Sequence, residues 1–87
     1  MIEHDEAVRD EQQRLRQLRL LVDVTAQVLA EDESLILCEA LRLIDAARTA
    51  SLRLFPERGE TFDLVVRPRL ERIVFERFGI ASAGPVN

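Results

Sequence analysis

The sequence lacks most of the side chains from which small functional sites are built. Its 87 residues include one cysteine, one histidine, three glycines and three prolines, and no tryptophan, tyrosine or lysine. A single cysteine excludes an intrachain disulfide. A chain of this length buries only about 60% of its unfolded surface. Association with another chain is therefore the natural source of additional burial.

The scarcity of histidine and cysteine also argues against metal and nucleophile chemistry. Metal sites need clustered His, Cys or carboxylate side chains, and the sequence contains neither a cysteine pair nor an HExxH pattern. His4 lies near the N-terminus, far along the chain from Cys38. Cys38 falls in the first turn of a predicted helix, where the helix dipole can activate a thiol, but cysteine is among the most often buried residue types. We expect Cys38 to be a small buried side chain, and we expect no enzyme activity, metal or cofactor.

Glycine and apolar runs are also too sparse for two common kinds of site. Gly59, Gly79 and Gly84 are isolated, so the phosphate-binding loops of nucleotide-binding proteins are missing. No run approaches the 18 apolar residues that a membrane span requires. The first residues, MIEHDEAVRDEQQ, are charged and polar, unlike a signal or transit peptide. We therefore expect a soluble cytoplasmic protein.

What the sequence does contain favours helices. Alanine, leucine, arginine and glutamate dominate the composition. We predict an all-α fold, a small antiparallel bundle of three to four helices at about 8–31, 35–54, 60–67 and 68–78. Residues 1–12 are expected to be a polar, partly disordered arm or a helix extension, 13–79 one helical domain, and 80–87 a disordered tail.

The first predicted helix has a narrow apolar stripe. The spacing of its apolar positions alternates between three and four, as in an amphipathic helix with a coiled-coil-like seam. The stripe contains Leu15, Leu18, Val22, Thr25 and Leu29.

The segment from Ser34 to Phe55 is the most apolar part of the chain. On a helical wheel its apolar side chains cover an arc of roughly 200°, whereas a one-sided surface helix needs little over 100°. We therefore expect it to lie centrally between the other helices, with Ser34 or Asp32 as its N-cap, and to use part of the arc for association. The expected association surface consists of Leu37, Leu41, Ile44, Leu52 and Phe55.

Two prolines and a glycine predict how the last third of the chain is divided. Pro56 should end the second helix, and Gly79 should end the last one. Pro68 should either separate two helices or kink one. Alternating residues from Thr61 to Val66 also allow a short strand, although that strand would have no partner.

The arginines of the last helix raise the possibility of nucleic-acid binding, through Arg67, Arg69, Arg72 and Arg77. The charge balance weighs against it. Residues 1–33 contain nine acids and four arginines (−5), 34–55 two acids and three arginines (+1), and 56–87 five of each (0), which sum to the net charge of −4. Nucleic-acid-binding domains usually carry a strongly basic face.

The sequence thus predicts a non-enzymatic structural or protein–protein interaction module. We expect it to form a homodimer or to dock on a larger protein, without a membrane. The alternative is a small nucleic-acid-binding regulator that uses the arginines of the last helix.

Overall fold

The computed structural model describes residues 2–80, with side chains from residue 6 onward, and contains no strand within that range. Two long helices come first, and a run of helical turns completes the chain. The elements are α1 (Ile2–Glu31), α2 (Leu37–Leu54), a 3-10 turn (Pro56–Arg58), α3 (Gly59–Thr61), a π-helical turn (Phe62–Val66) and α4 (Arg67–Phe78).

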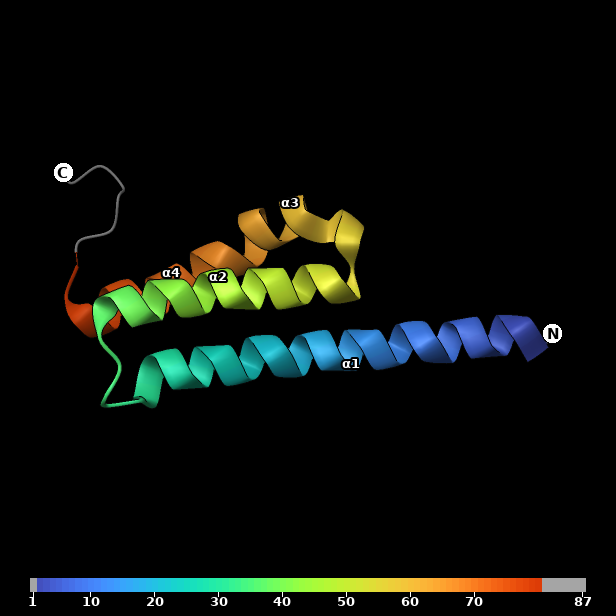
Figure 1. Ribbon diagram of the computed structural model, residues 1–87, viewed down its shortest axis with the longest axis horizontal. Coiled ribbons are helices and arrows are strands. Elements are labelled where there is room, and N and C mark those ends of the chain that lie inside the picture. Colours follow the sequence, from blue (N-terminus) through green and yellow to red (C-terminus); the bar gives the residue numbers. More distant parts are fainter. Residues whose placement is uncertain (1, 81–87) are drawn as a thin grey trace.

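These elements form an antiparallel up-down-up bundle, so the predicted all-α fold is confirmed (Figure 1). The bundle has three helices rather than four, because α3, the π turn and α4 follow one another without a break as the third helix. Each of α1, α2 and α4 packs against the other two. As predicted, the second helix packs on one flank against the first helix and on the other against the last, but α1 and α4 are also neighbours, so α2 is not the sole central helix.

Pro68 explains why the third helix contains a π turn. Proline lacks an N–H and its ring clashes with the carbonyl four residues earlier. In the turn before it, the Arg67 N–H donates to the carbonyl of Phe62, five residues back. The wider turn lets the helix continue through the proline, so the predicted separate helices at 60–67 and 68–78 are one. The alternative strand at 61–66 is also wrong, since those residues are helical.

The start of α1 and the N-cap of α2 can be compared with the sequence prediction. Helix α1 begins at Ile2, so its backbone includes the predicted N-terminal arm as far as the structure describes it. The N-cap of α2 is Ile36, not Ser34 or Asp32, and the Glu39 carboxylate accepts a hydrogen bond from the Ile36 N–H at 3.2 Å. Asp32 instead accepts from both the N–H and the hydroxyl of Ser34, and so shapes the connecting turn.

Gly79 ends α4 as predicted. Its φ of 68° is left-handed, which suits a residue without Cβ, and the Ile80 N–H donates to the Phe75 carbonyl at 2.8 Å. The predicted disordered tail at 80–87 lies, apart from Ile80, outside the described residues.

The core is small and is supplied by all three helices. Helix α2 contributes only a narrow stripe to it: Ala40, Ile44, Ala47 and Ser51. Three of these four residues are small, which lets the neighbouring helices approach α2 closely. The buried stripe is much narrower than the apolar arc of roughly 200° described from the sequence. The buried apolar side chains are Val22, Leu29, Ala40, Ile44, Ala47, Phe55, Phe62, Leu70 and Val74.

The buried stripe of α2 predicts that two neighbouring substitutions on this helix will affect stability differently. Ile44 is 1% exposed, so Ile44→Asp should unfold the domain by stranding a charge in the core. Leu41 is 41% exposed, so Leu41→Asp should change the melting temperature only slightly. Thermal unfolding followed by circular dichroism compares the two variants, and equal melting temperatures would contradict this assignment of the core.

Candidate association surfaces

The five residues of the expected association surface on α2 differ in their exposure. Ile44 and Phe55 are buried within the chain itself, and Leu52 is half-buried. Leu37 and Leu41, one turn apart near the start of α2, remain exposed. The five residues therefore do not share one open surface, and only these two leucines present substantial apolar area to solvent.

A cluster of ion pairs fixes how α4 lies along α2. Arg48 binds Asp63 of the π turn with two hydrogen bonds, 2.7 Å to Oδ1 and 3.0 Å to Oδ2. Arg67 lies 3.2 Å from Asp45 of α2 and 3.5 Å from Asp63. The hydrogen bond from Arg48, reinforced by the nearby charge, lowers the pKa of the Asp63 carboxyl. Planar guanidinium–carboxylate pairs of this kind set orientation as well as energy.

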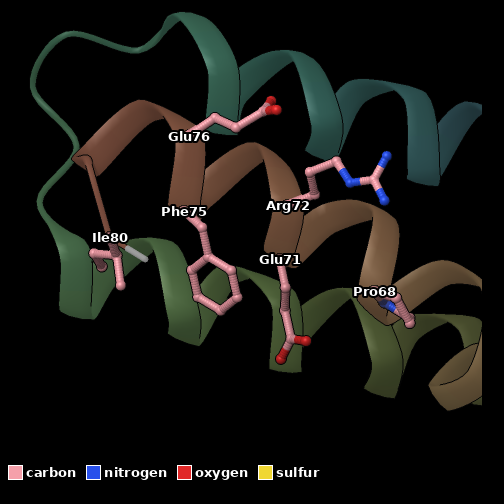
Figure 2. Close-up of a pocket in the computed structure, with 6 residues that line it drawn as sticks. All are labelled: Pro68, Glu71, Arg72, Phe75, Glu76 and Ile80. Carbon is pink, nitrogen blue, oxygen red and sulfur yellow. The ribbon is translucent and has the colours of Figure 1, made fainter. Parts of the chain in front are cut away.

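Farther along the two helices from these ion pairs, apolar side chains of α2 and α4 reach the surface. Because the two helices are antiparallel, the Arg67–Asp45 pair sets Leu41 and Leu37 of α2 alongside the later turns of α4. Figure 2 shows Phe75 and Ile80 on the side of α4 nearer α2. Both are half-buried and line a shallow hollow on α4. The α2–α4 contact therefore has ion pairs near the start of α4 and exposed leucines of α2 alongside the later turns of α4.

The four arginines proposed for nucleic-acid contact do not act together. Arg67 is occupied by Asp45 and Asp63, and Arg77 donates to backbone carbonyls of the α1 end. Arg69 and Arg72 are exposed and have no ion pair among the described residues. Two of the four guanidiniums are thus internal structural groups, and the basic surface of α4 is correspondingly small.

Arginines from neighbouring helices satisfy the ends of α1 and α2, a role that sequence inspection missed. Arg77 donates to the carbonyl of Leu29 at 2.8 Å and to that of Asp32. Arg14 donates to the carbonyl of Leu54, the last residue of α2, at 3.3 Å and lies over the Phe55 ring. The last carbonyls of a helix have no partner within the helix, so these contacts meet a real need. They join residues 40 and 48 positions apart, and no local pattern signals them.

Helix α1 extends well beyond the end of α2, so of the two predicted alternatives for residues 1–12, the described ones form a helix extension. Arg14 already lies beside the end of α2, so residues 2–13 project past that helix (Figure 1). Every described side chain from Glu6 to Gln13 is exposed. Val8 and Leu15 lie on the same side of α1 as Val22. Val22 is buried, whereas Val8 and Leu15 are 39% and 44% exposed. The described side chains of the projecting part, Val8 among them, are thus open to solvent; we call residues 2–13 the α1 overhang.

The described part of the chain contains no cluster suited to metal binding. No group of three or more His, Cys, Asp or Glu side chains is placed to hold a metal ion within residues 6–80. Cys38 is exposed, so the expectation of a buried cysteine is wrong; it precedes the first core position of α2, Ala40. The cavity beside Ser51 and Phe62 holds about 60 Å³, whereas the hollows on α4 (about 450 Å³) and beside the α1–α2 turn (about 540 Å³) are larger but shallow and open to solvent. No helix of the described chain is long and apolar enough to cross a membrane.

The contacts of Arg77 generate a stability prediction with an internal control. Arg77→Met should lower the free energy of unfolding by about 1–3 kcal/mol, because the Leu29 carbonyl loses its side-chain donor and the Asp32 carbonyl keeps only the Leu35 N–H. Arg69→Met, the same change at an exposed site on the same helix, should stay within about 0.5 kcal/mol of wild type. Urea unfolding measures both values, and equal losses would show that the Arg77 contacts add nothing.

Because the pKa of Asp63 is lowered in the folded chain, we predict that its contribution to stability is lost as the pH falls. A carboxyl whose pKa is lower in the folded chain stabilises the fold above its unfolded pKa, and this contribution disappears as the pH falls through the folded pKa. Asp63→Asn should therefore flatten part of the decline in melting temperature below about pH 4. Asp23→Asn, at an exposed site, is the control. Identical acid profiles for both variants would rule out a contribution from the Arg48–Asp63 pair.

Comparisons with known proteins add no functional information to this geometry. No protein-family model matches the chain, and neither the curated proteins nor the solved structures include a match. The function is therefore inferred from the exposed surfaces alone, namely the α1 overhang, the Leu37–Leu41 surface and the exposed arginines.

Proposed function

We propose that this protein is a non-enzymatic helical interaction module that self-associates. The observation that carries the proposal is the apolar stripe of α1, whose exposed members are Leu15, where the bundle ends, and Val8, on the α1 overhang. The overhang continues α1 and needs no helix nucleus of its own, but most helix stability in proteins comes from packing of an amphipathic face. The overhang, 12 residues long, gains stability chiefly from packing, and a partner chain supplies that packing.

The size of the core supports association as well. Only nine apolar side chains are buried among the described residues, and several large ones stay exposed on α1, α2 and the π turn. A domain with so small a core gains more from burial against a second chain than a larger domain would. The Leu37–Leu41 surface and the exposed Leu64 and Val65 of the π turn are further uncovered areas, and a larger protein partner would bury them in the same way.

The alternative of a nucleic-acid-binding regulator draws less support. Of the four arginines on which it relies, Arg67 and Arg77 are held by intramolecular contacts. Arg69 and Arg72 alone are too few for the basic face that such proteins usually present.

The oligomeric state tests the proposal, and α1 supplies matched variants. Sedimentation equilibrium at micromolar concentrations should show a reversible dimer. Leu15→Glu should weaken dimerisation at least tenfold, because it places a charge on the uncovered stripe. Leu20→Glu is the control, since Leu20 is 64% exposed and lies roughly 140° around the helix from Leu15.

Both variants should keep the wild-type helix content and melting temperature when measured at concentrations where the wild type is monomeric. A wild-type protein that stays strictly monomeric over the whole concentration range would refute self-association. A dimer weakened equally by the two substitutions would place the interface elsewhere than on this stripe.

A further inference from the structure

The charges of α1 are divided sharply between its two ends. Residues 2–11 contain five acids and one arginine, a net charge of −4, and residues 12–22 contain three arginines and no acid, a net charge of +3. The boundary lies between Glu11 and Gln12. Arg16 and Arg19 are exposed and have no ion pair among the described residues. They line a shallow hollow on the helix surface together with Gln12 and Leu15.

The exposed apolar residues of the same region are symmetric about that boundary. Val8 lies three residues before Glu11, and Leu15 lies three residues after Gln12. They are seven residues apart, so both point to the same side of the helix. A two-fold axis at the boundary, perpendicular to α1, would therefore bring Val8 of one copy opposite Leu15 of the other, and the reverse.

We propose that α1 pairs antiparallel with α1 of a second copy, about a two-fold axis between Glu11 and Gln12. The acidic overhang of each copy then lies along the arginine segment of the other, and the two Val8–Leu15 contacts form the apolar centre. This proposal rests on the proposed self-association and specifies its surface and register.

The charge pattern favours this partner and this direction over others. A parallel pair would place five acids beside five acids and three arginines beside three arginines, which is repulsive at both ends. In the antiparallel pair both ends attract. The interface is also isologous, with the same patch used by both copies, as closed two-fold dimers require.

Cysteine cross-linking tests the register directly. The exposed Cys38 is first replaced by Cys38→Ser, and Val8→Cys, Leu15→Cys and Leu20→Cys are then made singly in that background. The Val8→Cys and Leu15→Cys proteins, mixed under mild oxidation, should form a covalent heterodimer. In this register two copies of residue 8 lie about 10 Å apart along the helix, at about 1.5 Å per residue, beyond the reach of a disulfide of about 7 Å. Val8→Cys alone should therefore remain largely uncross-linked.

The mixture of Val8→Cys with Leu20→Cys is the negative control, because residue 20 lies on another side of α1. Faster cross-linking of Val8→Cys with itself would indicate a parallel pair and overturn the proposal. A wild-type dimer without the Val8–Leu15 cross-link would overturn the register but leave self-association standing. A monomeric wild type would refute both.

Charge variants give an independent readout. Arg16→Glu combined with Arg19→Glu makes α1 acidic throughout, and should weaken dimerisation at least tenfold at low salt. The wild-type dimer should itself weaken as salt is raised from 50 mM to 500 mM, because exposed ion pairs are screened. Dimerisation that neither the double variant nor salt affects would contradict the pairing of acidic and basic halves.

Discussion

At the ends of α1 and α2, guanidinium groups from other helices donate hydrogen bonds to carbonyls that have no partner within the helix. Arg77 of α4 serves the end of α1, and Arg14 of α1 serves the end of α2. Each contact relates the end of one helix to a fixed turn of another, and so sets how far the helices slide along each other. With the Arg67–Asp45 pair, these contacts hold a register in which residues 2–13 of α1 lie beyond the end of α2.

Much of the fold could be predicted from local sequence because the signals that specify it are local. The spacing of Val22, Thr25 and Leu29 identifies the buried side of α1 correctly, and Gly79 marks the end of α4. Pro68 was harder to interpret, since a proline can end a helix or sit within one. The outcome depends on the preceding turn, where the Arg67 N–H reaches one residue farther back than in an α-helix. Nothing in the residue types from 62 to 66 signals that choice.

The candidate surfaces were less predictable, because exposure depends on where a neighbouring helix ends. Helical periodicity puts Leu41 and Ile44 on one apolar arc, but only the packing of α4 decides that Ile44 is buried and Leu41 is not. The roles of the arginines could not be predicted from local sequence either. By type and position, Arg69 and Arg77 are alike, yet a carbonyl of α1 lies within reach of Arg77 only. The charge division of α1 is visible in the sequence, but its meaning depends on the overhang, which appears only once the helix lengths are known.

The exclusive use of arginine has a consequence for alkaline conditions. The helix-end contacts of Arg14 and Arg77 and the pairs of Arg48 and Arg67 all use guanidinium groups. Guanidinium is a side-chain type that keeps its positive charge in proteins, whereas the ammonium group of lysine begins to lose its charge near pH 10. A fold whose charged contacts all use arginine therefore keeps them in alkali that would neutralise ammonium groups.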